Sequence, residues 1–317
     1  MKKIIFLIIF SFSTLINAWI IENVGTFKFE KISPKVWIMH GPKAEPNQQN
    51  QGFMNNPGLV VGATGLVVID PGSSYLVGKR VLAEIEKISK KPIKAIFNTH
   101  IHGDHWLGNQ ALIEKYPAAK IYAHPNMIFQ AKDGGAASWI KIMQDLTKGA
   151  AAGTIATYPT DSTSHLQIIS VAGEQFKIHN PTKKSHTDTD IMIEHIGSKT
   201  LFLGDNDFVN RQGRFDNSAN MHGNIQVLQY ALALKLSNYV PGHGASGDAK
   251  SAVQPFLSYL LTVQTEVKKG YENDLADYEI KPLAAKKLSA YRHWHGFQEQ
   301  LGRHISKMLL EVEALDL

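Results

Sequence analysis

The stretch Thr99-His100-Ile101-His102-Gly103-Asp104-His105 is the part of this chain that decides its fold and its chemistry. Its three histidines and one aspartate place imidazole and carboxylate groups within six positions. These groups are the ligands that zinc and neighbouring transition metals prefer. The stretch directly follows residues 93–97, a short apolar segment that predicts a buried strand. We therefore expect a metal site in a loop at the end of a strand.

The N-terminus has the pattern of a secretory signal peptide. Two lysines precede an apolar run over residues 4–12, and Ala18 offers a small residue at a cleavage site. The run is too short to span a bilayer comfortably. We expect a signal peptide over residues 1–18, a mature chain that starts near Trp19, and a periplasmic or secreted protein without stable membrane insertion. An uncleaved N-terminal anchor is the alternative.

The composition excludes several classes of protein. The chain has no cysteine, which excludes disulfides, thiolate metal ligands and a cysteine nucleophile. The formal net charge is +5, but the basic residues are scattered over predicted helix surfaces, as in residues 87–94. Such a distribution does not indicate a nucleic-acid partner. We expect a small-molecule substrate, and the sequence does not indicate an oligomeric state.

Both halves of the chain are rich in predicted strands. The first half predicts a helix and four strands, over residues 75–90 and over residues 58–61, 66–69, 93–97 and 121–123. The second half predicts two strand pairs, over residues 166–171 with 175–179 and 191–195 with 201–203. Two strand-rich halves, each followed by helices, predict two sheets packed face to face with helices outside.

Two other segments predict helices. Residues 131–164 are rich in Gly, Ala, Ser and Thr, and we expect one helix near residues 137–147 with flanks that border an active site. From residue 249 onward, apolar residues recur at helical spacing. We therefore divide the mature chain into a domain over residues 19–248 and a helical C-terminal extension over residues 249–317.

Three more residues of metal-ligand type stand where predicted strands begin or end. His186 precedes a strand, Asp205 follows residues 201–203, and His243 follows an apolar pair. Loops at strand ends are where a rigid scaffold presents reactive groups.

Taken in order, these motifs resemble the metallo-β-lactamase-fold hydrolase superfamily. The likeness runs from about residue 30 to residue 248 and also includes Asp70, near the end of the second predicted strand. It implies an α/β protein with a four-layer αββα sandwich, here with a C-terminal helical extension. The closing residues 309–314 and the helical tail are also similar to exported zinc metallohydrolases of quinoprotein oxidation systems.

The resemblance implies a site for two zinc ions, with iron or manganese as alternatives. Its ligand assignment places His100, His102 and His186 on one ion, Asp104, His105 and His243 on the other, and Asp205 as a bridge between them. Paired metal ions supply a hydroxide nucleophile at neutral pH and stabilise developing negative charge. Asp104 is also our candidate catalytic residue, which would orient that hydroxide. Asp70 either orients a ligand or caps the following turn.

Differences between this chain and related enzymes at the motif positions limit the activities that we expect. Diiron oxygen-reducing relatives carry Glu where this chain has His102, so a redox role is disfavoured. One β-lactamase class has a lysine three residues after the bridging position, where this chain has Phe208, and Asp207 adds an acid that we expect to repel an anionic substrate. His222 and Arg214 lie in a predicted polar loop and are our candidates for substrate contact.

The sequence thus predicts an exported dinuclear zinc hydrolase. Its metal-bridging hydroxide would attack an ester, thioester, lactone, amide or phosphoester. Three alternatives stay open: a β-lactamase proper, a mononuclear iron enzyme, and a metal-stabilised, non-catalytic accessory protein of a periplasmic redox system.

Overall fold

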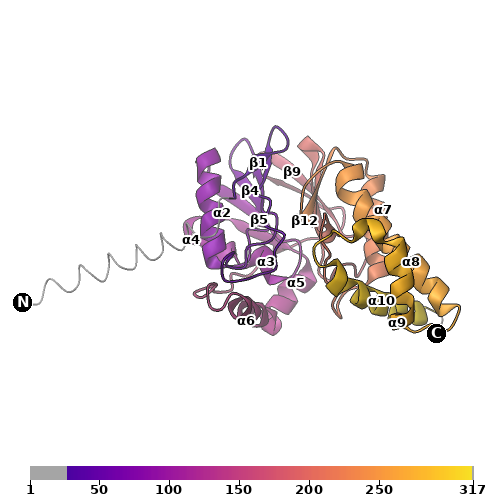
Figure 1. Cartoon of the computed structure of the whole chain (residues 1–317). Coiled ribbons are helices and arrows are strands. Elements are labelled where there is room, and N and C mark those ends of the chain that lie inside the picture. The colour runs from indigo at the N-terminus through magenta and orange to yellow at the C-terminus, as the bar shows by residue number, and fades with distance from the viewer. Residues whose placement is uncertain (1–26, 316–317) are drawn as a thin grey trace, which may run out of the picture.

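The structure, a computed structural model, describes residues 27–315. The expected signal peptide and its cleavage site lie outside the described residues. Two mixed sheets face each other in the middle of the molecule (Figure 1). The first sheet has the strand order β1 (Glu30–Lys31), β2 (Val36–Ile38), β3 (Gly58–Val61), β4 (Leu66–Ile69), β5 (Ile93–Phe97), β6 (Lys120–Ala123) and β7 (Asp161–Ser162). The second has the order β12 (Asn238–His243), β11 (Thr200–Phe208), β10 (Met192–His195), β9 (Glu174–His179) and β8 (Ile168–Val171).

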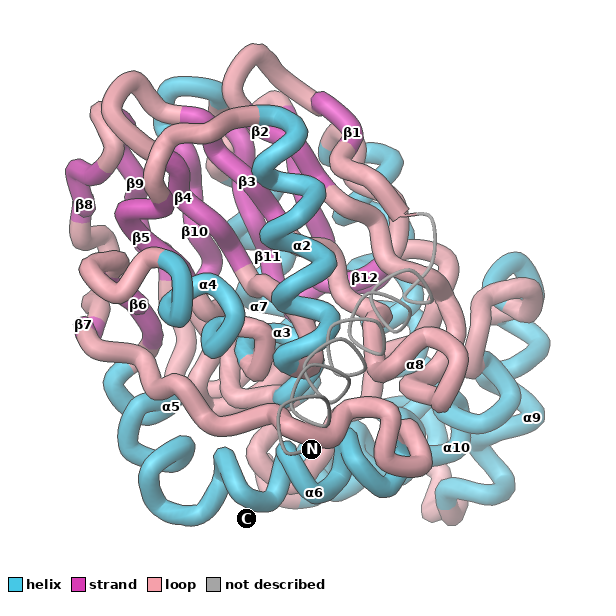
Figure 2. Tube along the Cα trace, turned by 90° about the vertical axis from the view of Figure 1, so that its left-hand side faces the viewer, coloured by secondary structure: helices cyan, strands magenta, loops and turns pink. Residues whose placement is uncertain are grey.

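Helices cover the outer face of each sheet, with α2 and α4 on one side and α7 and α8 on the other (Figure 1). Figure 2 shows α5 and α6 together along one edge of the sandwich, near α3. The helices are α2 (Tyr75–Ile88), α3 (Gly103–Trp106), α4 (Asn109–Lys115), α5 (Pro125–Gln130), α6 (Ala136–Leu146), α7 (Met221–Ala233), α8 (Gln254–Tyr271), α9 (Asp277–Lys287) and α10 (Phe297–Glu313), with short turns η1 (Ala131–Gly135), η2 (Ile196–Ser198), η3 (Ala249–Val253) and η4 (Ser289–Tyr291). The predicted αββα architecture is confirmed.

Strand β4 shows why its sequence is apolar without interruption. All four of its residues are buried. Successive strand side chains point to opposite faces: Leu66 and Val68 pack against α2 and α4, whereas Val67 and Ile69 pack into the interior between the sheets. A strand that is covered on both faces must be apolar at every position.

Several elements differ from the sequence prediction: β1, β2, β7, α4 and α7 were not predicted as separate elements, and two further differences have a clear physical reason. Strand β11 runs on to Phe208 instead of ending near residue 203, because it continues as a parallel partner of β12. Gly204 lies within it with φ of 54°, a conformation that favours glycine. The short helix α5 was not predicted; Pro125 occupies its first turn, and the His124 ring accepts a hydrogen bond from the backbone of Asn126.

The helices that follow residue 249 share one hydrophobic core with α7, β11 and β12. Phe256 and Leu260 of α8 and Ile305 and Met308 of α10 are buried in it. The boundary at residues 248 and 249 stays a prediction. Within residues 27–315, no helix combines the length and apolar character that a membrane crossing requires.

We expect Ile305→Ala to lower the free energy of unfolding by about 2–5 kcal/mol, because it leaves a cavity in this shared core. Leu310→Ala on the same helix is the matched control, since Leu310 is 63% exposed and should change stability by less than about 0.5 kcal/mol. Denaturant titration of both variants measures the difference. Equal effects of the two substitutions would show that α10 does not contribute to the core.

Candidate metal centre

The two sheets bring the expected ligands to one edge of the sandwich. Strands β4, β5 and β6 are parallel, as are β11 and β12, so their carboxyl ends meet at that edge. His100 follows β5, and α3 carries Asp104 and His105. Asp205 lies in β11, His243 ends β12, and His186 lies in the loop before β10.

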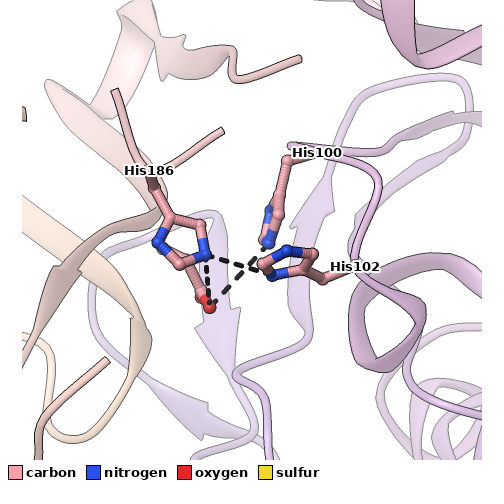
Figure 3. A group of neighbouring side chains, drawn as sticks. His100, His102 and His186 are labelled. Atoms are coloured by element: carbon pink, nitrogen blue, oxygen red, sulfur yellow. Dashed lines mark hydrogen bonds and ion pairs between the residues drawn. The ribbon is translucent and has the colours of Figure 1, made fainter. Parts of the chain in front are cut away.

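The first group of potential ligands consists of His100, His102, His186 and Asp205. Figure 3 shows the rings of His100 and His102, from the loop after β5, converging with the ring of His186, from the loop before β10. Nε2 of His186 lies 3.1 Å from Nδ1 of His102. Oδ2 of Asp205 lies 3.5 Å from Nε2 of His186 and 3.8 Å from Nε2 of His100. These spacings suit donor atoms that share one ion.

The second group consists of Asp104, His105 and His243. Nε2 of His243 lies 3.2 Å from Oδ2 of Asp104, and Nε2 of His105 lies 3.4 Å from the same oxygen. The other oxygen of Asp205, Oδ1, lies 3.0 Å from Nε2 of His105 and 3.3 Å from Nε2 of His243. Asp205 thus presents one carboxylate oxygen to each group.

The donor atoms fit metal ions better than they fit one another. Nε2 of His100, Nε2 of His105 and Oδ1 of Asp205 are buried and make no hydrogen bond within the described residues. Buried polar atoms normally have partners. Two neighbouring ions would provide them, and imidazole and carboxylate donors suit zinc, iron and manganese.

Burial and neighbouring charges shift the pKa values of histidines in the two groups in opposite directions. Burial lowers the pKa of the His186 imidazole to about 3 and that of His100 well below its ordinary value. Both rings are therefore neutral, which is the state that binds a metal. In the second group, burial is outweighed by the carboxylates of Asp205 and Asp104, which raise the pKa of His105. A cation bound there would take over the role of that proton.

Hydrogen bonds from outside the two groups fix the orientation of the rings. Oδ2 of Asp70 accepts hydrogen bonds from Thr99 Oγ1, at 2.6 Å, and from His105 Nδ1, at 2.8 Å, so Nε2 of His105 faces the site. Nδ1 of His243 donates to the backbone oxygen of Met54 over 2.8 Å. Such partners hold the ring nitrogen that faces a metal free of its proton.

His102 has the opposite ring orientation: its Nδ1, and not its Nε2, faces the other ligands. Its Nδ1 faces His186, and its Nε2 lies 3.4 Å from Oδ2 of Asp216. Asp216 is half exposed, and it was not singled out from the sequence. A carboxylate at this nitrogen favours the form of His102 whose Nδ1 is unprotonated and available.

A pocket with about 730 Å³ of empty space opens onto both groups. One wall is the apolar face of α6, formed by Trp139, Ile142, Met143 and Leu146. The other lining residues are Glu45, Pro46, Met54, His102, Asp104, His186, Asp205, Phe208, Arg211, Gln212, Gly213, Arg214 and His243. The pocket is therefore apolar along α6 and charged around residues 211–214.

Of the two residues that we expected to contact substrate, Arg214 lines the pocket. His222 does not: it lies in the first turn of α7, where Nδ1 bonds Glu311 over 2.8 Å. Asp207 is not among the residues that line the pocket either. Its side chain is fully buried, and burial raises its pKa. The expectation that Asp207 repels an anionic substrate was wrong, since the acid does not reach the pocket.

Sequence reasoning predicted the helix near residues 137–147 and expected its flanks to border the site, but it missed that α6 itself forms a wall of the pocket, and it missed Glu45 and Arg211. The spacing of Trp139, Ile142, Met143 and Leu146 was a signal for an apolar helix face, but it did not tell which cavity that face borders. Glu45 and Arg211 are 166 residues apart, and no local pattern connects them.

Comparison with known proteins agrees with this geometry. A family model described as the metallo-beta-lactamase superfamily matches residues 50–243, which is more than half of the chain. The chain belongs to the metallo-β-lactamase superfamily. Relatives that match this chain include proteins named as hydrolases.

Curated relatives match over short segments. A linear primary-alkylsulfatase of Pseudomonas sp. is 39% identical over 74 residues, which are 22% of this chain and 14% of that protein. A hydroxyacylglutathione hydrolase of Nostoc sp. is 47% identical over 55 residues, 17% of this chain and 20% of that protein. The chain thus matches a fifth or less of the length of these two relatives.

Solved structures share the fold. A metallo-β-lactamase from Pontibacter korlensis aligns with a TM-score of 0.58 and 20% identity, over 74% of this chain and 99% of that one. An inverting sec-alkylsulfatase from Pseudomonas sp. aligns with a TM-score of 0.67 and 15% identity, over 90% of this chain and 50% of that one.

We expect Asp104→Ala to bind about one zinc ion where the unmodified chain binds about two, because only the second group loses a ligand. Elemental analysis after dialysis against buffered zinc measures this stoichiometry. Asp207→Asn is the control: burial raises the pKa of Asp207, so the neutral amide should leave both ions bound. Two ions in Asp104→Ala would contradict the assignment of Asp104 to the second group.

We expect Asp70→Asn to weaken metal binding about 10–100-fold through loss of the carboxylate that orients His105. Competition with a chromophoric chelator gives the affinity. The surface variant Asp161→Asn, on the exposed edge strand β7, should leave it unchanged. An unchanged affinity in Asp70→Asn would mean that the hydrogen bond to His105 does not serve metal binding.

Proposed function

We propose that this chain is an exported dinuclear zinc hydrolase that cleaves an ester-type bond in a substrate with an apolar group. The observation that carries the proposal is the position of Asp205, whose two carboxylate oxygens face two different groups of ligands at the base of one pocket. A carboxylate in that position is suited to bridge two cations.

Seven residues would bind the metal ions, and one of them would also orient the attacking water. His100, His102 and His186 would hold one ion, Asp104, His105 and His243 the other, and Asp205 would bridge them. Zinc in such a pair supplies an activated water nucleophile at neutral pH and stabilises negative charge that develops on the substrate. Asp104 also lines the pocket, so its carboxylate is placed to orient the attacking water.

The wall of α6 selects the substrate. Trp139 and Met143 offer an apolar surface beside the ligands, and Phe208 stacks on the His243 ring with the ring centroids 5.6 Å apart. Apolar walls exclude water and strengthen the electrostatic interactions inside a site. An alkyl or acyl chain that lies along α6 would bring its ester group to the ligands.

The relatives support this class of substrate. One relative acts on alkyl sulfates and another on hydroxyacyl-glutathione, according to their names. A sulfate ester or a thioester with an apolar substituent would each suit the pocket of this chain. Export is supported by the lysines, the apolar run and the small residue that the sequence places over residues 1–18.

A substrate panel tests the proposal with zinc-loaded protein that spans residues 19–317. The panel holds aryl esters of increasing acyl length, an alkyl sulfate, a glutathione thioester, a lactone, a phosphodiester and a cephalosporin. We expect turnover of one ester-type class, with the rate constant for that class reduced at least about 1000-fold in Asp104→Ala.

Trp139→Ala separates the apolar wall from the chemistry. It should raise KM for long-chain substrates and leave short-chain substrates nearly unchanged, because each methylene buried against the wall contributes about 0.8 kcal/mol. Hydrolysis of the cephalosporin alone would identify a β-lactamase proper. If protein with two bound ions turns over no substrate class of the panel, the accessory-protein alternative is favoured.

A further inference from the structure

The charged end of the pocket has donors without a hydrogen-bond partner among the described residues 27–315. Arg211 lines the pocket and is only 3% exposed. Its Nη1 donates to the backbone oxygen of Lys43 over 3.2 Å, and its Nη2 donates to Oε1 of Glu45 over 2.9 Å. Its Nε is buried and has no hydrogen-bond partner within the described residues. A buried guanidinium donor without a partner calls for an explanation.

Gln212 adds a second unsatisfied group at the same place. It also lines the pocket and is 3% exposed. Neither its Nε2 nor its Oε1 has a hydrogen-bond partner in the part of the chain that the structure describes. Leaving such groups unpaired in the interior destabilises the folded chain. A ligand with acceptor atoms would remove part of this cost.

A carboxylate of the protein already lies between the two arginines. Oε1 of Glu45 pairs with Arg211, and its Oε2 lies 3.4 Å from Nη2 of Arg214. The planar guanidinium group matches carboxylates and similar oxyanions in geometry. The pair with Arg214 is solvent-exposed, with 62% and 44% of the two side chains accessible, and such exposed pairs contribute little stability. Glu45 can therefore leave Arg214 at small cost.

We propose that Arg211, Gln212 and Arg214 form an anion-binding subsite, and that Glu45 occupies it until the anionic group of the substrate replaces it. This inference rests on the proposed hydrolase function and names its substrate class. The substrate is an amphiphilic monoanion: its apolar part lies along α6, its hydrolysable bond lies at the ligand groups, and its second, anionic group binds the arginines. A carboxylate or a sulfonate has the required chemistry.

The charges that face the subsite agree with this class. Arg211 and Arg214 carry two positive charges against the one negative charge of Glu45, and the His295 ring lies 3.9 Å from Glu45. Asp104 and Asp205 line the same pocket as carboxylates, and the two bound metal ions would offset their charge. The buried Asp207 lies outside the pocket lining and does not oppose an anion. Glu45 instead disfavours neutral substrates, which cannot compensate the arginines when they displace it.

Pairs of ligands that differ only in the anionic group test the proposal. The probes are mercaptoalkanoates and their methyl esters of matched chain length, whose thiolates bind zinc equally. Isothermal titration of the zinc-loaded full-length protein gives both dissociation constants. We expect the unmodified protein to prefer the carboxylate, and Glu45→Gln to increase this preference about tenfold, because the competing charge is removed.

Variants of the two arginines should instead lower the preference for the carboxylate over the ester. Arg214→Gln, and Arg211→Lys, which keeps the charge of the buried residue but not its planar group, should each reduce the preference about tenfold and leave the ester affinity unchanged. Arg303→Gln is the matched control, because Arg303 is exposed on α10 and outside the pocket lining. Equal affinities for acid and ester in all variants would overturn the subsite.

An alkanoate without a thiol separates failure of the subsite from failure of the metal site. In protein stripped of metal, its affinity should fall in Arg214→Gln and rise in Glu45→Gln. Unchanged affinity in both variants overturns the subsite, whatever the metal content. Loss of thiol binding together with this Arg214-dependent alkanoate binding would instead overturn the zinc hydrolase and keep the anion subsite.

Discussion

The carboxylate of Asp205 is the group on which the rest of the site depends. It is 5% exposed and surrounded by imidazoles of both ligand groups. Burial raises the pKa of a carboxyl group, but the neighbouring His243 and His105 outweigh it and hold the pKa of Asp205 well below its usual range. A buried carboxylate must be compensated by nearby positive charge. Metal ions between the two groups would provide it without protons on the ligands.

The backbone around Asp205 is shaped to keep that carboxylate in place. A side chain at Gly242 would overlap Oδ1 of Asp205, and one at Gly204 would lie 2.7 Å from Cβ of Thr99. The two glycines therefore let β11, β12 and the loop after β5 approach one another closely. This approach brings together His243 of β12, Asp205 of β11 and His100 of the loop after β5.

The pocket combines two kinds of recognition around the same chemistry. The face of α6 is apolar, whereas residues 211–214 are polar and only partly satisfied within the protein. An apolar surface contributes affinity in proportion to buried area, and buried polar groups reject ligands that cannot pair with them. The proposed anion subsite would let such a pocket discriminate among substrates by the charge of a group that does not react.

Local sequence determined the central strands of both sheets, the helices α2 and α6, the helical character of the tail and the ligand string, but not the edge strands β1, β2 and β7 or the helices α4, α5 and α7. Residues 58–61, 66–69 and 93–97 were predicted within the exact bounds of β3, β4 and β5, because apolar runs and strand-end loops are local signals. The spacing of His100, His102, Asp104 and His105 indicated metal chemistry for the same reason. Only the tertiary structure decided that Asp207 is buried, that His222 pairs with Glu311, and that Glu45 meets Arg211. These outcomes depend on contacts between segments far apart in the chain, and no periodicity in the sequence encodes them.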